Sequence, residues 1–172
     1  MTDPQILRRT GFQAAIVDLD GTMVDTVGDF EVALGGALAD LGCKPVDQAF
    51  IRLTVGKGSE HLIKRTLEQV GAPASLYDQA WERYQHHYLA INGQHSAVYA
   101  GVIEGLKALR ERGFKLACLT NKPTAFAMPL LAAKGLAEHF TVAFGGDAFP
   151  RKKPDPMPLL EACKALGTAP ER

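Results

Sequence analysis

Two aspartates separated by one residue follow an apolar segment near the start of the chain. Residues 12–17 are largely apolar and lead directly to Asp18 and Asp20. Such a segment predicts a buried parallel β-strand. Side chains two residues apart on an extended backbone point to the same face, so both carboxylates can border one pocket. Because ligands of parallel α/β sheets bind beyond the carboxyl ends of the strands, we expect these acids to face a substrate.

A pair of carboxylates at this place could carry out phosphoryl transfer. Asp18 could attack phosphorus as a nucleophile, while Asp20 protonates the leaving oxygen and later activates water. Two negative groups would repel a phosphate dianion, so the arrangement requires a cation, and we expect Asp18 and Asp20 to bind Mg²⁺. Gly21 would supply the tight turn beside the bound phosphate. The alternative is that these residues form only a turn or a helix cap.

Length and composition limit the kinds of protein that the chain can be. Its 172 residues, 47% of them apolar, suffice for one core and a small second lobe. Lysine and arginine together number 19, as do aspartate and glutamate, so no basic field favours nucleic acid or an anionic membrane as a partner. The N-terminus lacks an apolar signal core and the longest apolar segments are strand-sized, which indicates a cytoplasmic protein. We expect a monomer or a homodimer.

The cysteines and histidines do not indicate a metal site or a disulfide framework. Cys43, Cys118 and Cys163 are widely spaced and include no Cys-x-x-Cys pair. The histidines show no metal-ligand spacing related to the aspartates. We expect the cysteines to be buried, reduced thiols.

A helical segment separates the first strand from the next α/β unit. Residues 27–91 contain no strand-like pattern and place apolar residues at helical spacing. Four helices are expected to start near Val27, Asp47, Ser59 and Ser75. Ser75 and Asp78 would form a capping box for the fourth helix. That helix would place three aromatic residues on one face, which we interpret as packing: Trp81, Tyr84 and Tyr88.

A second strand ends on residues that are suited to binding an anion. Residues 115–119 predict a buried strand, and Thr120 and Asn121 follow it before Lys122 and Pro123 open a helix. A hydroxyl, an amide and a helix N-terminus would converge there, and helix N-termini favour anions. This predicts a phosphate site, unless the residues serve only to start the helix.

A third strand, residues 140–144, precedes a short segment that is rich in cations and prolines. The segment reads Arg-Lys-Lys-Pro-Asp-Pro at residues 151–156. Taken alone, lysines in such a segment indicate a solvated surface.

Together these segments resemble the haloacid dehalogenase-like hydrolase superfamily. Its first motif, Asp-x-Asp-Gly-Thr-x-x-Asp, is matched in full, and the match is to the phosphatase branch because the dehalogenases lack an acid at the position of Asp20. The resemblance implies that Thr120 and Asn121 hold the transferring phosphoryl group. Alignment on the two prolines implies that Lys153, rather than Lys152, is the lysine whose ammonium neutralises Asp18 and the phosphoryl oxygens.

The resemblance also implies the fold and the domain organisation. It predicts an α/β fold in which residues 1–24 and 98–172 form a Rossmann-like parallel sheet core. Residues 25–97 would form a four-helix cap, similar to that of phosphoglycolate phosphatase-like and phosphoglucomutase-like members. The cap would close over the pocket and exclude water. Lys57, in the loop Val-Gly-Lys-Gly-Ser, would contact substrate, although the glycines of that loop could form a turn alone.

The superfamily expects one more strand and an acidic motif that completes the Mg²⁺ site, and the sequence stops at Arg172 before either. We therefore expect a core that lacks its C-terminal strands and has one side of its sheet unpaired. Asp147 precedes Lys153 in the sequence and is not assigned as a metal ligand.

The resemblance implies a Mg²⁺-dependent phosphomonoesterase that forms an aspartyl-phosphate on Asp18. The implied substrate is a small phosphorylated metabolite, 2-phosphoglycolate in the first place. A sugar-phosphate phosphatase or mutase would share the motifs and differ in its cap contacts. A hypothesis from another class is that the chain catalyses nothing and binds phosphate ligands or a partner.

Overall fold

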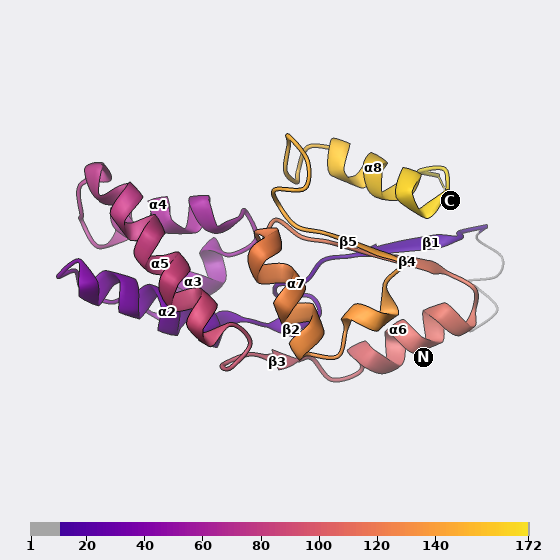
Figure 1. Cartoon of the computed structure of the whole chain (residues 1–172), viewed down its shortest axis with the longest axis horizontal. Coiled ribbons are helices and arrows are strands. Elements are labelled where there is room, and N and C mark those ends of the chain that lie inside the picture. The colour runs from indigo at the N-terminus through magenta and orange to yellow at the C-terminus, as the bar shows by residue number, and fades with distance from the viewer. Residues whose placement is uncertain (1–10, 172) are drawn as a thin grey trace.

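A parallel β-sheet lies at the centre of one part of the molecule, and a bundle of helices forms the other end (Figure 1). The computed structural model describes residues 11–171. The sheet has three strands in the order β1 (Ala14–Val17), β4 (Lys115–Leu119) and β5 (Val142–Phe144). Both pairings are parallel. The carboxyl ends of the strands therefore share one edge, which faces the helical bundle in Figure 1.

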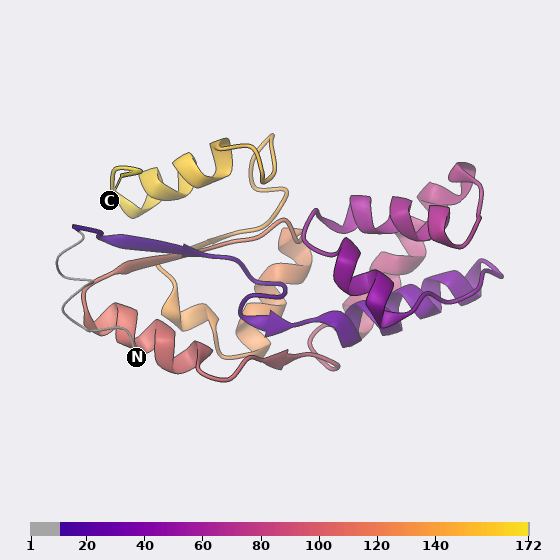
Figure 2. The same ribbon diagram turned by 180° about the vertical axis from the view of Figure 1, so that it is seen from behind.

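Helices cover both faces of the sheet, as Figures 1 and 2 show from opposite sides. One face is covered by α8 (Met157–Leu166). The other is covered by α6 (Val102–Glu111) and α7 (Thr124–Ala133), with a short 3₁₀ helix, η2 (Ala137–His139), after α7. The prediction of an α/β fold with a parallel sheet core is confirmed.

The central strand packs its side chains alternately on the two helical layers. Ala117 clusters with Leu166 of α8. Its neighbours Leu116 and Cys118 cluster on the opposite face with residues that include Leu131 of α7. This alternation follows from the two-residue period of a strand. β4 is also the one strand of the three with a neighbouring strand on both sides.

The first strand differs from its prediction. It covers Ala14–Val17 rather than residues 12–17, and all four of its residues are only partly buried, so the prediction of a buried strand was wrong. The physical reason is its position, because β1 pairs with β4 alone among the described strands and lies at an edge of the sheet. The third strand is also shorter than predicted, since Phe140 still belongs to the turn that closes η2.

Four α-helices lie in the segment predicted to be helical. They are α2 (Val27–Asp40), α3 (Gln48–Thr54), α4 (Ser59–Gln69) and α5 (Tyr77–Ile91), and a 3₁₀ helix, η1 (Ala74–Leu76), precedes the last. We call this bundle the cap. Its exact domain limits stay a prediction.

The ends of two cap helices test the predicted capping residues. Asp47 caps α3 as expected, since its carboxylate accepts a hydrogen bond from the N–H of Phe50 at 2.8 Å. The prediction of a capping box formed by Ser75 and Asp78 was wrong. The chain enters α5 through η1, and the N-cap residue of that helix, Leu76, makes no capping hydrogen bond through its side chain.

The aromatic face of α5 forms part of the cap's apolar cluster, which confirms that it serves packing. Tyr84 and Tyr88 are fully buried, and Tyr88 also lies against Phe30 of α2. Phe126 of α7 belongs to the same cluster, with its ring centroid 4.7 Å from that of Tyr88. A residue of the core therefore completes the apolar centre of the cap.

The chain passes from the core into the cap and back through two connections, which pair as short antiparallel strands, β2 (Val24–Asp25) and β3 (Ala97–Val98). Strands of two residues have no detectable periodicity, which is why the sequence did not predict them. Asp29, at the start of α2, holds the second connection, in which the chain returns from the cap to the core. Its carboxylate accepts hydrogen bonds from the N–H groups of Gly93 (3.0 Å) and His95 (2.7 Å).

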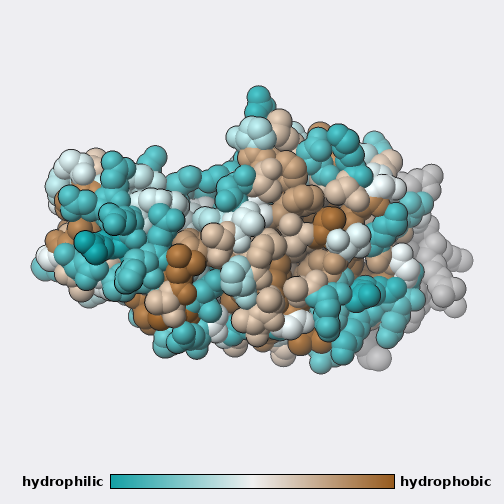
Figure 3. Space-filling view, viewed as in Figure 1, coloured by the Kyte–Doolittle hydropathy of each residue, from teal (hydrophilic) through white to brown (hydrophobic). Residues whose placement is uncertain are grey.

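The surface is polar over most of the cap, whereas apolar side chains gather near the middle of the face shown in Figure 3, over α7 and the sheet. Within residues 11–171, no helix has both the length and the apolar character needed to cross a membrane.

Cys118 should resist alkylation in the native protein. Of the three cysteines it alone is buried, so the prediction of buried thiols holds for Cys118 and not for Cys43 and Cys163. Burial raises the pKa of Cys118 to about 12, and the Asp18 carboxylate acts in the same direction. Because the thiolate is the reactive form, iodoacetamide at about pH 8 should label only the other two cysteines until the chain is unfolded. Peptide mass spectrometry checks this, and equal labelling of all three would contradict it.

Candidate active site

Asp18 follows β1 directly and lines a small pocket at the carboxyl edge of the sheet. Its Oδ1 accepts a hydrogen bond from the N–H of Leu19 at 2.8 Å and lies 3.1 Å from Nζ of Lys153. The Asp18 side chain is 37% exposed. Since both contacts end on Oδ1, Oδ2 is the oxygen that is left for a reacting atom.

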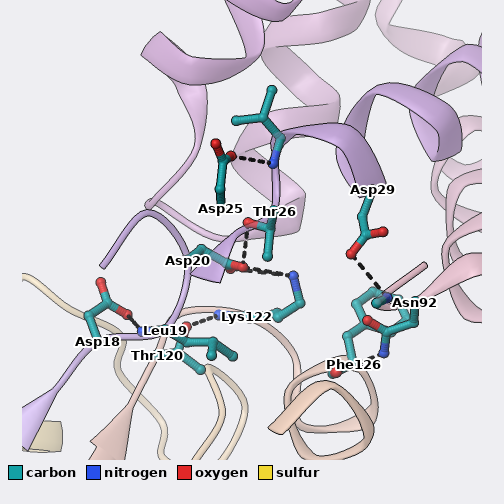
Figure 4. A network of polar contacts seen from close by, with 12 residues as sticks. Asp18, Leu19, Asp20, Asp25, Thr26, Asp29, Asn92, Thr120, Lys122 and Phe126 are labelled. Carbon is teal, nitrogen blue, oxygen red and sulfur yellow. Dashed lines mark hydrogen bonds and ion pairs between the residues drawn. The ribbon is translucent and has the colours of Figure 1, made fainter. Parts of the chain in front are cut away.

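Asp20 lines the same pocket and is held by two donors (Figure 4). Its Oδ1 accepts a hydrogen bond from the hydroxyl of Thr26 at 2.8 Å and lies 3.0 Å from Nζ of Lys122. The next residue, Gly21, turns the chain with φ +72°, a backbone conformation that favours glycine. The structure therefore brings the two predicted acids together, with the predicted turn directly after them.

Thr120 and Asn121 also line the pocket, at the carboxyl end of β4. Thr120 is buried and its Oγ1 accepts a bond from the N–H of Lys122. The Asn121 amide donates through Nδ2 to the carbonyls of Gly56 and Lys153, at 2.9 Å each, and its Oδ1 accepts from the N–H of Lys153. Both amide hydrogens are thus used within the protein. Asn121 joins the cap loop to the lysine segment, and a phosphate contact from it would have to come from its backbone.

The two lysines before the prolines have separate partners. Nζ of Lys153 lies beside Asp18 and donates to the carbonyl of Leu119 at 2.7 Å. Nζ of Lys152 instead pairs with the carboxylate of Glu60, near the start of α4 in the cap. The geometry places Lys153, and not Lys152, where a cation could balance the charge of Asp18.

The loop before α4 meets the core through its glycines. Gly56 and Gly58 line the pocket, and Gly58 has φ +91° and would bring an added Cβ to 3.2 Å from the carbonyl of Asn121. Lys57 lies between them with an exposed side chain and is not among the residues that line the pocket. The close approach predicted for this loop is present, but the structure does not bring Lys57 to the pocket.

Two oxygen donors of this site have the chemistry that Mg²⁺ requires, and their binding of Mg²⁺ stays a prediction. Across residues 11–171, no three or more His, Cys, Asp or Glu side chains gather as a metal cluster. The Asp18 carboxylate and the Asp20 main-chain carbonyl are hard oxygen donors, and Mg²⁺ commonly takes few protein ligands and keeps waters and substrate phosphate in its octahedron.

Asp147, which was not assigned as a metal ligand, caps the start of α7, where its carboxylate accepts a hydrogen bond from the N–H of Thr124 at 2.8 Å. Burial raises the pKa of Asp147, but its bonds with Thr124 hold it below its ordinary value.

Lys122 is the residue of the site that the sequence analysis missed. Its side chain is 1% exposed, and Nζ lies 4.4 Å from the ring centroid of Phe30 and 4.5 Å from that of Tyr88, while contacting Asp20. The only role predicted for Lys122 from the sequence was to begin a helix. Its place two residues after Thr120, on the segment that leaves the strand, is the signal that could have found it.

A family model described as haloacid dehalogenase-like hydrolase matches residues 15–172. The chain belongs to this family. The resemblance inferred from the motifs is confirmed.

Two relatives of this haloacid dehalogenase-like hydrolase show how far the similarity extends. A phosphoglycolate phosphatase of Nitrosospira multiformis is 43% identical over 161 residues, which cover 92% of this chain and 71% of the relative. A plasmid-encoded phosphoglycolate phosphatase of Cupriavidus necator is 42% identical over 154 residues, covering 89% of this chain and 67% of that protein.

Two solved structures share the fold of this chain. A predicted phosphoglycolate phosphatase from Haemophilus somnus superposes with a TM-score of 0.85 at 28% identity, over 91% of this chain and 72% of that one. CbbY from Rhodobacter sphaeroides, solved in complex with phosphate, has a TM-score of 0.76 at 24% identity, over 94% and 75% of the two chains. At that identity the second likeness concerns the fold alone.

Proposed function

We propose that this haloacid dehalogenase-like hydrolase is a Mg²⁺-dependent phosphatase that cleaves phosphomonoesters through an aspartyl-phosphate on Asp18. The observation that carries the proposal is the Asp18 carboxylate, which lies 3.1 Å from the ammonium of Lys153 and shares its pocket with Asp20 and Thr120. A nucleophile, an acid and a hydroxyl in one pocket, with a cation beside the nucleophile, are the parts that phosphoryl transfer needs. The names of the relatives support 2-phosphoglycolate as the substrate.

The reaction would have two steps. In the first, Oδ2 of Asp18 forms a bond to phosphorus while the bond from phosphorus to the ester oxygen breaks, and Asp20 gives its proton to the departing oxygen, releasing an alcohol. In the second, water attacks the phosphorus of the aspartyl-phosphate and Asp20 takes a proton from it. Phosphate leaves, and the Asp18 carboxylate is restored. The Lys153 ammonium and the Thr120 hydroxyl would bind the phosphoryl oxygens in both steps.

Mg²⁺, when held by Asp18 and the Asp20 carbonyl, would supply positive charge against the repulsion between carboxylates and phosphate. The cap loop of residues 55–59 would close one side of the pocket and exclude bulk water.

Removal of the metal and a panel of substrates test the proposal. The chain with Mg²⁺ should release phosphate from 2-phosphoglycolate faster than from hexose phosphates, EDTA should stop the release, and added Mg²⁺ should restore it. Faster hydrolysis of a hexose phosphate would favour a sugar-phosphate phosphatase. Absence of release from every phosphomonoester, with phosphate binding retained in calorimetry, would favour the non-catalytic binding protein.

A further inference from the structure

The geometry points to Lys122 as a positioning residue that holds the Asp20 carboxylate in place and connects it to the cap. This inference rests on the proposed function for its chemical meaning. Its structural basis is the set of contacts around the Lys122 ammonium, which Figure 4 shows beside Asp20 and Thr26.

The ammonium of Lys122 has a carboxylate on one side and two aromatic rings on the others. Nζ lies 3.0 Å from Oδ1 and 3.4 Å from Oδ2 of Asp20. It also lies within 4.5 Å of the ring centroids of Phe30 and Tyr88. A buried ammonium loses its hydration, and a carboxylate together with aromatic faces replaces part of that stabilisation. The side chain is therefore confined to this position.

The contacts orient Asp20 rather than merely neutralising it. Both short contacts of its carboxylate, from the Thr26 hydroxyl at 2.8 Å and from Lys122 at 3.0 Å, end on Oδ1. Within residues 11–171, Oδ2 keeps only the longer contact to Lys122, at 3.4 Å. A carboxylate anchored through one oxygen presents the other in a fixed direction, and Oδ2 is then the oxygen that exchanges a proton with substrate and water.

Lys122 itself is fixed by the core, whereas its aromatic neighbours belong to the cap. Its N–H donates to Oγ1 of Thr120 at 3.2 Å, and its carbonyl accepts from the N–H of Gly146 at 2.8 Å. Phe30 lies on α2 and Tyr88 on α5. Docking of the cap thus completes the surroundings of the lysine that holds the acid. The cap would act on the reaction from inside the protein as well as by covering the pocket.

The test compares Lys122→Met with wild type on two substrates whose leaving groups differ. Methionine keeps the length and packing of the side chain and removes the charge. An alkyl leaving group needs protonation by Asp20, while p-nitrophenolate leaves with little help. We expect kcat/KM for 2-phosphoglycolate to fall about 100-fold and that for p-nitrophenyl phosphate less than about 10-fold. Equal losses on both substrates would overturn the positioning role, since a general structural defect does not depend on the leaving group.

A double-mutant cycle with Asp20→Asn adds a second criterion. If Lys122 acts through Asp20, Lys122→Met should change kcat/KM little when Asp20 is already asparagine. Losses that multiply would overturn the inference. Lys64→Met is the matched control, because Lys64 is exposed, its Nζ lies 5.3 Å from the ring centroid of Tyr77, and it is not among the residues that line the pocket. Its replacement should leave kcat/KM unchanged.

The same cycle measured by urea unfolding does not depend on catalysis. The two single variants and the double variant should show non-additive shifts of the unfolding midpoint, because each single change leaves a charged partner alone. Additive shifts would overturn the contact itself. If wild type hydrolyses no phosphomonoester, the proposed function fails, and the unfolding cycle still decides whether Lys122 holds Asp20.

Discussion

Asp18→Asn should abolish phosphate release from any phosphomonoester. Asparagine has nearly the same size and can keep a bond to the N–H of Leu19, but its amide is no nucleophile and no longer pairs with Lys153. Loss of a covalent nucleophile removes the step that every substrate shares, so we expect a decrease in kcat of about 10⁴-fold or more. A coupled assay for inorganic phosphate measures the decrease.

Two observations complete that experiment. Acid-quenched wild-type protein should carry a phosphoryl group on the peptide that contains Asp18, and the variant should not. Asp47→Asn is the matched control, because Asp47 caps α3 on the surface and asparagine caps helices equally well, so its activity should equal that of wild type. A variant of Asp18 that kept full Mg²⁺-dependent turnover would refute the covalent mechanism.

Asp29→Ala should cause the largest loss of stability. Asp29 is fully buried, and its two oxygens accept hydrogen bonds from the N–H groups of Gly93 and His95. Alanine would leave both N–H groups without this acceptor and would remove the buried carboxylate that holds α2 against the second connection between core and cap. We expect the free energy of unfolding to fall by about 2–4 kcal/mol. Urea denaturation followed by circular dichroism measures it.

Asp40→Ala provides the comparison on the same helix. The Asp40 carboxylate also has a hydrogen-bonding partner, His87 at 2.9 Å, but it lies on the surface, where such pairs contribute little. Its replacement should change the free energy of unfolding by less than about 1 kcal/mol. Equal losses for the two variants would show that the buried bonds of Asp29 are not what holds the second connection.

The sequence predicted those parts of the site that follow from strand ends. Asp18 and Thr120 are far apart in the chain, but each directly follows a strand of one parallel sheet, and the carboxyl ends of such strands meet. Lys153 comes well after the end of β5 at Phe144, and the resemblance to the family's motifs is what selected it. Apolar periodicity likewise placed the four cap helices. These features depend on local patterns and on topology, which a single sequence carries.

The parts that could not be predicted depend on how the cap docks on the core. The amide of Asn121 reaches a cap carbonyl at Gly56, and Lys122 enters the space between two rings of the cap. No periodic pattern encodes such contacts, because each joins elements whose relative placement is fixed only by the packed structure. The exposed position of Lys57 has the same origin, whereas the partial burial of β1 follows from its position at an edge of the sheet.

The ring of Phe126 has a consequence for exchanging caps between related enzymes. Because this residue of α7 packs against Tyr84 and Tyr88, the apolar cluster of the cap includes a side chain that belongs to the core. A graft that transferred the four helices alone would leave those tyrosines facing an unmatched surface. A functional chimera would therefore have to transfer the first turn of α7 together with the cap.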